Sequence, residues 1–221
     1  MSRRSVTSRV GYGSDVPTNR EPDATRRSER AHTAILRATK KLITKVGYDR
    51  MSIEAIAATA GVGKQTIYRW WPSNAAVVLD MWAPAVEKKL IFPDSGDLVA
   101  DLKAQITAVI DLGQDPVFGP SFRALVAESQ HDQTLATQLL ERIFLPRIAA
   151  GKARLRAGQD AGHLAPDVDL DIAIDLLYGG FYHRYLLRVA PLDPEYPGAI
   201  VDAALNGIGA GPKSGRLGQR Y

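Results

Sequence analysis

The chain has 221 residues, carries 28 Lys and Arg against 24 Asp and Glu, and contains no Cys. The absence of Cys excludes a disulfide scaffold, a thiolate nucleophile and a Cys-based zinc site. No apolar run approaches the roughly 18 to 20 residues that cross a bilayer, and the first residues hold no apolar segment of a secretory signal. We therefore expect a cytoplasmic protein with no membrane partner.

The charge of the chain is unevenly distributed. Residues 1–71 hold 14 Lys and Arg against 6 Asp and Glu, a net charge of +8, whereas residues 72–221 hold 14 against 18, a net charge of −4. A basic first third on an acidic remainder is typical of a nucleic-acid-binding domain joined to a second domain. The alternative is a basic surface that only aids solubility.

Residues 1–28 are rich in Arg, Ser, Thr, Gly and Pro and poor in apolar side chains. Such a segment cannot bury enough surface to offset its chain entropy, so its composition predicts a disordered basic arm. Basic arms can lie along phosphates or enter a minor groove, and a passive tail is the alternative. The arginines of this arm are Arg3, Arg4, Arg9, Arg20, Arg26 and Arg27.

Helical periodicity begins after this arm. A buried face with a period of 3.6 residues predicts a first helix that ends at Gly47. Ser52 is a preferred N-cap residue for a second short helix, which Gly61 ends. A third helix covers about residues 63–70, and Ser73 can cap a fourth that continues through residue 82. The face of the first helix consists of Ile35, Ala38, Thr39, Leu42, Ile43 and Val46.

The remainder of the chain also has the pattern of helices separated by Gly and Pro, and no alternation typical of β-strands appears. Together with the first four, these segments predict an all-α fold of about nine helices. The candidate helices are residues 97–112, 116–129, 132–157, 168–190 and 195–208.

Residues 53–71, IEAIAATAGVGKQTIYRWW, have the form of two short helices joined by a tight turn, the helix-turn-helix unit. Ala57 is small where the helices cross, and Gly61 supplies a turn in which a Cβ would be strained. Val62 and Ile67 fill the core between the helices. The outer face of the third helix, residues 63–70, keeps polar side chains that can reach bases and phosphates in a major groove. These are Lys64, Gln65, Thr66, Tyr68 and Arg69.

Residues 35–79 resemble the DNA-binding domain of the tetracycline-repressor (TetR) family. The tract AGVGKQTIYRWWPSNAAVV matches that family's run of Ala-Gly-Val-Ser, a polar residue, Thr-[Leu/Ile]-Tyr, an aromatic residue and Ser-Lys. The preceding GYDRMSIEAIA matches its Gly-[Tyr/Phe] turn and second helix. Gly63 replaces the usual capping Ser at small expected cost. Asn74 replaces the common Lys, which removes one phosphate-neutralising charge.

The resemblance implies roles at the matched positions. Lys64, Gln65 and Thr66 would face bases or phosphates, and Tyr68 would contact the DNA backbone. Trp70 would pack on phosphate and sugar, whereas Trp71 aligns with an aromatic residue of the core. Ser73, Asn74 and the N–H groups at the start of the fourth helix could bind a phosphate. The full set of candidate DNA-binding residues is Ser52, Lys64, Gln65, Thr66, Tyr68, Arg69, Trp70, Ser73 and Asn74.

The resemblance also implies a dimer, in which the last two long helices of each subunit form a four-helix bundle. Two recognition helices would then lie about 34 to 36 Å apart, which fits a palindromic operator in double-stranded DNA. Both helices carry apolar ladders that agree with such pairing, and Gly179 and Gly180 would permit close helix approach. The ladders are Leu170, Ile174, Leu177 and Phe181 on one helix and Ile200, Ala203, Ala204 and Ile208 on the other.

In the family, a small effector bound in the larger domain changes the separation of the two DNA-binding domains. Apolar and aromatic residues are candidates for its pocket here and favour a hydrophobic or amphipathic effector, although aromatics at helical spacing are also typical of a core. The candidate effector-binding residues are Trp82, Phe118, Phe122, Leu125, Tyr178, Tyr182 and His183. The expected division is a disordered basic arm (1–28), a helix-turn-helix DNA-binding domain (29–76), a ligand-binding and dimerisation domain (77–210) and a flexible tail (211–221).

Other functions fit the sequence less well. None of the four His residues has the spacing of a metal site, and no Gly-rich phosphate loop or GxSxG elbow occurs, so we expect no enzyme, metal or cofactor. DNA binding without a ligand would not need the roughly 130 residues beyond the first domain. A transcriptional activator or an ungated DNA-binding protein of the same fold remains the alternative. The resemblance favours a repressor.

Overall fold

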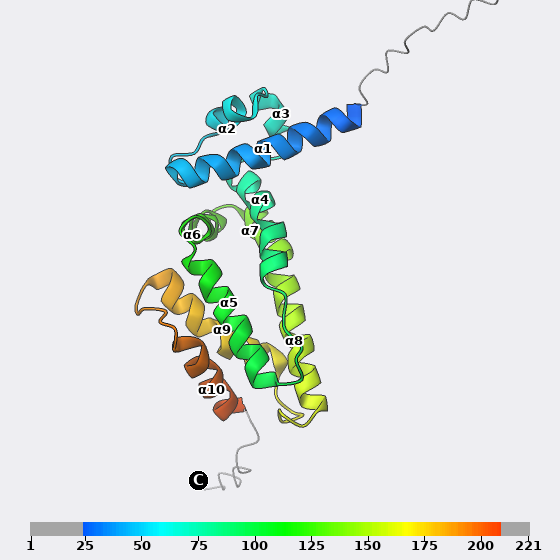
Figure 1. Cartoon of the computed structure of the whole chain (residues 1–221), viewed down its shortest axis with the longest axis vertical. Coiled ribbons are helices and arrows are strands. Elements are labelled where there is room, and N and C mark those ends of the chain that lie inside the picture. The colour runs from blue at the N-terminus through cyan, green and yellow to red at the C-terminus, as the bar shows by residue number, and fades with distance from the viewer. Residues whose placement is uncertain (1–23, 209–221) are drawn as a thin grey trace, which may run out of the picture.

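The computed structural model describes residues 24–208, and every regular element in this range is helical (Figure 1). Helices α7 and α8 join through the π-helical turn η1 without a break, so this part of the chain forms nine separate helical rods. The prediction of an all-α fold of about nine helices is confirmed. The elements are α1 (Ala24–Val46), α2 (Ile53–Ala60), α3 (Lys64–Tyr68), α4 (Asn74–Lys89), α5 (Leu98–Gln114), α6 (Phe118–Ser129), α7 (Gln133–Leu139), η1 (Leu140–Phe144), α8 (Leu145–Asp160), α9 (Leu170–Leu187) and α10 (Tyr196–Ile208).

Helices α1, α2 and α3 form a head at one end of the molecule (Figure 1). The Ser52 hydroxyl accepts a hydrogen bond from the Ala55 N–H and caps α2, and Gly61 ends that helix with a left-handed φ of 69°. Ser73 caps α4 in the same way. The side chains of Ile35, Ile56 and Ile67, one from each head helix, are fully buried together in the head core. The caps and the core predicted for this part of the chain are confirmed.

Two boundaries in the head differ from those expected. Helix α1 begins at Ala24, and so includes residues 24–28 of the predicted arm; Ala and Arg there favour a helix. Helix α3 is shorter than expected and ends at Tyr68. Gly63 is its N-cap and supplies no side-chain hydrogen bond. The rest of the predicted arm, residues 1–23, and the predicted tail, residues 211–221, lie outside the described residues.

The remaining helices form the body. Helix α4 runs from the head into the body and lies beside α7 and η1, while α10 packs against α5 and α9 (Figure 1). The core of the body includes buried Leu102 of α5, Leu155 of α8 and Leu177 of α9. In the range 24–208, none of the helices has both the length and the apolar character needed to cross a membrane.

A buried ion pair ties α5 to α8 inside the body. Arg154 Nε donates to Asp101 Oδ2 over 2.8 Å, and the Ser95 N–H and hydroxyl also donate to this carboxylate. Burial raises the pKa of Asp101, but the hydrogen bonds from Ser95 and Arg154 outweigh it and hold that pKa below its usual value. Asp101 is therefore ionised and fully paired at neutral pH.

The apolar ladder predicted to pair α9 with a second subunit packs inside its own subunit instead. Leu170, Ile174, Leu177 and Phe181 are all buried in the body core. The periodicity misled because α9 also carries large apolar residues on its opposite, exposed face. Close helix approach does occur at Gly180, where an added Cβ would clash with the Tyr196 hydroxyl of α10, again within the subunit.

Candidate nucleic-acid interface and internal cavity

The outer face of α3 presents a compact polar surface. Ile67 is fully buried and fixes the helix on the head core, so the other side of this helix faces solvent. Lys64, Gln65 and Arg69 are exposed there, and Tyr68 is 53% exposed. Thr66 is half-buried at the edge of the same surface. This placement suits all five candidate residues of α3 and its C-terminal end for contact with DNA.

Lys64 has a partner on the neighbouring helix. Its Nζ donates to Glu54 Oε1 over 3.0 Å, and both side chains are exposed. The hydrogen bond from Lys64 lowers the pKa of Glu54, and the same bond raises the pKa of Lys64. Both groups are therefore charged at neutral pH, and a phosphate that approached Lys64 would compete with Glu54 for it.

The candidate residues at the starts of α2 and α4 make hydrogen bonds within the protein that position the helix backbone. Ser52 and Ser73 are half-buried, and each uses its hydroxyl to cap a helix. The Asn74 side-chain amide donates to the Met51 carbonyl over 3.2 Å, which ties the start of α4 to the residue before the cap of α2. These three residues therefore orient two helix N-termini, whose free N–H groups can bind a phosphate.

Trp70 packs partly against the protein itself, although it was expected to face the DNA. It is half-buried, its ring centroid lies 5.3 Å from that of His32, and Arg69 Cζ lies 5.0 Å above its ring. Trp71 is 5% exposed, as expected for a core residue, and lies 4.8 Å from His32. The two tryptophans and His32 thus form a cluster between α1 and the end of α3.

Asp80 of α4 joins this cluster to the body. Its Oδ2 accepts from Trp71 Nε1 over 3.2 Å and lies 3.2 Å from His32 Nε2. Its Oδ1 accepts from the guanidinium of Arg142, which belongs to η1. A second contact joins head and body where the Tyr48 hydroxyl donates to Glu128 Oε1 over 2.6 Å. Asp80 is the side chain through which the end of α3 and the turn η1 are linked.

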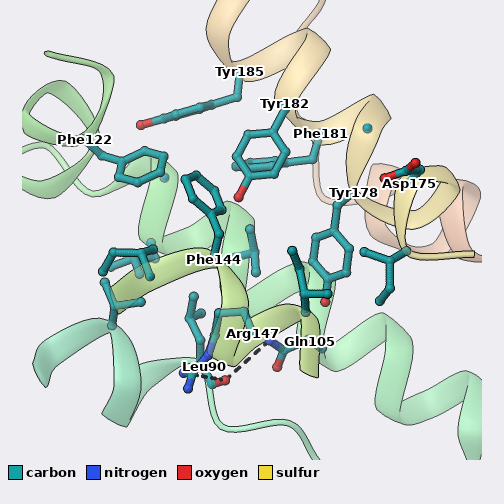
Figure 2. A pocket seen from close by; sticks show the side chains of 18 of the residues that line it. Leu90, Gln105, Phe122, Phe144, Arg147, Asp175, Tyr178, Phe181, Tyr182 and Tyr185 are labelled. Carbon is teal, nitrogen blue, oxygen red and sulfur yellow. Dashed lines mark hydrogen bonds between the residues drawn. The ribbon is translucent and has the colours of Figure 1, made fainter. Parts of the chain in front are cut away.

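The body contains a partly open cavity of about 210 Å³ between α4, α5, α6, η1, α8 and α9 (Figure 2). Aromatic rings make up much of its wall, and they come from α6, η1 and α9. Figure 2 shows most of these rings at one end of the cavity and Arg147 and Gln105 at the other. The aromatic lining residues are Phe118, Phe122, Phe144, Tyr178, Phe181, Tyr182 and Tyr185.

Four of the seven predicted effector-binding residues line this cavity: Phe118, Phe122, Tyr178 and Tyr182. Trp82 and Leu125 are buried behind the wall, where Trp82 packs edge-on against Phe118 at 5.0 Å. His183 does not line this cavity, because it is exposed on the opposite face of α9. One residue further along a helix turns the side chain by about 100°, so His183 points away where Tyr182 points in.

Several lining residues were not predicted. The spacing of Tyr178, Phe181, Tyr182 and Tyr185 places all four on one face of α9, and this signal could have identified Phe181 and Tyr185. Phe144, Arg147 and Gln105 carry no such signal, since their positions depend on how η1 and α5 pack against α9.

The polar end of the cavity contains two buried atoms without partners. Gln105 Nε2 and Arg147 Nη1 both donate to the Leu90 carbonyl, over 3.5 and 3.3 Å. Gln105 Oε1 and Arg147 Nε are buried with no hydrogen bond. Burial raises the pKa of Tyr178, beside Gln105, to about 12, and it also raises the pKa of Tyr182. Both hydroxyls stay protonated at neutral pH and can donate.

No three His, Asp or Glu side chains gather as a metal site among residues 24–208. The polar groups of the cavity suit hydrogen bonding to an organic molecule.

Two family models match the chain. The model of bacterial regulatory proteins of the tetR family matches residues 35–81, and that of the tetracyclin repressor-like C-terminal domain matches residues 92–204. The first match spans most of the head and the second spans most of the body.

Known proteins match over most of the chain. An uncharacterized HTH-type transcriptional regulator of Bacillus subtilis, YdeS, is 32% identical over 184 residues, which cover 83% of this chain and 92% of that protein. The DNA-binding transcriptional repressor TetR of Mycobacteroides abscessus is 29% identical over 184 residues, 81% of this chain and 94% of that one. The crystal structure of the TetR family transcription regulator SCO0332 gives a TM-score of 0.70 at 35% identity and covers 81% and 98% of the two chains.

Proposed function

Because the chain belongs to the TetR family of DNA-binding transcription regulators, we propose that it is a ligand-responsive repressor. A homodimer binds a palindromic operator, and a small hydrophobic or amphipathic effector in the body cavity releases it. The observation that carries this proposal is the link through Asp80, which joins the end of α3 to the turn η1 on the cavity wall. The family is one of regulators and not of enzymes.

The DNA-binding domain of the proposal comprises about residues 29–76, and the ligand-binding and dimerisation domain about residues 77–210. The exposed polar face of α3 enters the major groove, with Gln65 and Lys64 toward the bases or phosphates and Tyr68 toward the backbone. The capped N-termini of α2 and α4 add N–H groups for phosphates on either side.

An exposed stripe on α9 supports the homodimer. Ile172, Leu176 and Leu187 are 54%, 44% and 65% exposed, and an added Cβ at Gly179 would meet no atom within 4 Å. His183 lies on this same stripe. Large apolar side chains that recur on one helix face mark a surface for burial against a partner. A second copy that packs its α9 and α10 here forms a four-helix bundle and buries the stripe.

The coupling between effector and DNA follows from η1. Phe144 of this turn lines the cavity, while Arg142 of the same turn holds Asp80. A ligand that displaces Phe144 shifts Arg142, and with it the carboxylate that binds Trp71 and His32. Such a ligand weakens operator binding only to the extent that it prefers the conformation in which the spacing of the two heads does not fit the operator. DNA weakens ligand binding by the same factor.

In vitro DNA selection with the purified full-length protein at a fixed salt concentration tests the proposal. We expect a palindrome of two half-sites whose centres are about one helical turn, or a multiple of it, apart. The variant Gln65→Ala, which removes an exposed side chain and leaves the head core intact, should change the preferred base at one position of each half-site. If no sequence is enriched and the DNA is bound only at low salt, the binding is electrostatic and non-specific, and the proposal is refuted.

A further inference from the structure

The wall of the cavity is built from flat aromatic faces. Phe118 and Phe122 stack with an interplanar angle of 13°, and Phe181 and Tyr185 stack at 14°. Phe144 lies between these groups, 6.1 Å from Phe122 and 5.9 Å from Tyr182 by ring centroids. Ring faces and edges attract another aromatic ring more strongly than they attract a saturated group of equal size. The wall therefore favours a planar aromatic molecule.

The volume of the cavity limits the size of that molecule. An apolar cavity of about 150 Å³ accommodates benzene. In proportion, 210 Å³ takes roughly eight or nine non-hydrogen atoms, that is one substituted ring or a small bicycle. A long acyl chain would extend beyond this volume.

The polar end of the cavity selects a hydroxyl group. Gln105 Nε2 faces the Leu90 carbonyl, and Gln105 Oε1 is buried without a hydrogen bond. The Tyr178 hydroxyl lies beside this amide, so a ligand hydroxyl would share Gln105 with Tyr178. Arg147 Nε is a donor that lacks an acceptor, and the Tyr182 hydroxyl also points into the cavity (Figure 2). A phenolic hydroxyl both donates and accepts, whereas a carboxylate only accepts and an ether oxygen cannot donate.

We propose that the effector is a small phenol, a one- or two-ring aromatic compound whose hydroxyl bonds to Gln105 and Arg147 while its ring lies against Phe144 and the rings of α9. This inference rests on the proposed function only in that it calls the bound molecule an effector. It concerns the cavity alone, so it can be tested without DNA.

Calorimetric titration of the full-length protein with three probes of nine non-hydrogen atoms each tests the inference. They are 4-ethylphenol, 4-ethyltoluene, which replaces the hydroxyl by a methyl group, and 4-ethylcyclohexanol, which saturates the ring. We expect 4-ethylphenol to bind at least tenfold more tightly than either of the others. Equal or weaker binding of 4-ethylphenol than of either matched probe would overturn the inference.

Two variants assign the selectivity to named atoms. Gln105→Met removes the unpaired acceptor at similar size, and Tyr182→Phe removes one donor. We expect Gln105→Met to abolish the preference for 4-ethylphenol over 4-ethyltoluene, while the affinity for 4-ethyltoluene itself stays the same and shows that the cavity is intact. Unchanged preference in Gln105→Met would also overturn the inference, whatever the result with Tyr182→Phe. If the probes discriminate as expected but no operator is found, the proposed function fails and the cavity chemistry stands.

Discussion

Arg142 donates from its guanidinium to Oδ1 of Asp80, although the two residues lie 62 positions apart in the sequence. The second oxygen of the same carboxylate accepts from Trp71 of the head. Arg142 belongs to a π-helical turn in an otherwise α-helical rod, and such turns are frequently found at functional sites. Since Phe144 of that turn lines the cavity, one short segment contacts both the ligand space and the support of the head.

Arg142→Gln should uncouple the effector from DNA. The neutral side chain no longer holds Asp80, so a shift of η1 is not passed to Trp71. We expect the ratio of operator dissociation constants with and without saturating ligand, roughly 5- to 150-fold for a coupled regulator, to fall toward one. Fluorescence anisotropy with labelled operator measures this ratio. Arg156→Gln, an exposed arginine on α8, is the matched control and should keep the wild-type ratio; if Arg142→Gln keeps it as well, coupling does not run through Asp80.

Tyr68→Ala should weaken binding to many DNA sequences by about the same factor. The hydroxyl is exposed at the end of α3 and is assigned to the DNA backbone, so its loss removes one hydrogen bond that carries no sequence information. The expected loss is about 0.5 to 1.5 kcal/mol, or roughly two- to tenfold in affinity. Affinities for the operator and for a set of point-mutated operators provide the measurement, with Tyr68→Phe separating the hydroxyl from the ring. A changed order of preferred sequences at unchanged affinity would instead make Tyr68 a base-reading residue.

Leu176→Arg should convert the dimer to a monomer. A charge placed at the centre of the α9 stripe would be buried without a partner in the four-helix bundle, which costs about 3 kcal/mol or more. Sedimentation velocity measures the association state, and operator affinity should fall with it. Leu145→Arg on α8, where the native leucine is similarly exposed, is the control and should remain dimeric. A dimeric Leu176→Arg protein would place the interface elsewhere.

Local signals in the sequence were sufficient for much of the fold. Ser52 and Ser73 cap helices as expected, and Gly61 adopts the left-handed conformation that ends α2. These features depend on one or two residues and their immediate neighbours, so they can be read directly. The same holds for the outer face of α3, which is exposed because Ile67 of the same helix is buried.

Features that depend on packing between distant segments were not accessible from the sequence. Helix α9 is apolar on two faces, and periodicity alone could not tell which face is internal, so the ladder containing Leu177 was assigned to the wrong partner. The contributions of Phe144 and Gln105 to the cavity depend on the relative placement of η1, α5 and α9. The pairing of Asp80 with Arg142 likewise has no local pattern.

Asp101→Asn should destabilise the body strongly. The substitution removes one charge of a buried pair and leaves Arg154 with only the exposed carboxylate of Asp94, 3.7 Å away. The expected cost in the free energy of unfolding lies at the lower end of the roughly 3 to 5 kcal/mol for breaking a buried pair. Because the folded-state pKa of Asp101 is lowered, the stabilisation is complete above the unfolded pKa of about 4 and is lost as the pH falls through the folded pKa.

Urea denaturation of the two proteins at pH 7 and at pH values below 4 measures this difference. The gap between wild type and Asp101→Asn should be largest at pH 7 and should narrow in acid. Asp111→Asn, an exposed carboxylate on the same helix, serves as the control. A gap that does not change with pH would mean that the charge of Asp101 contributes nothing.

The most direct test of a ligand-responsive regulator is the operator dissociation constant measured before and after the cavity is filled. Calorimetry first establishes the concentration of 4-ethylphenol that saturates the wild-type protein, and anisotropy at fixed salt then gives the operator affinity with and without it. We expect the affinity to fall by roughly 5- to 150-fold, and the ligand to bind the operator complex more weakly by the same factor. An operator affinity that stays the same with the cavity saturated would contradict the coupling of the cavity to the DNA-binding head.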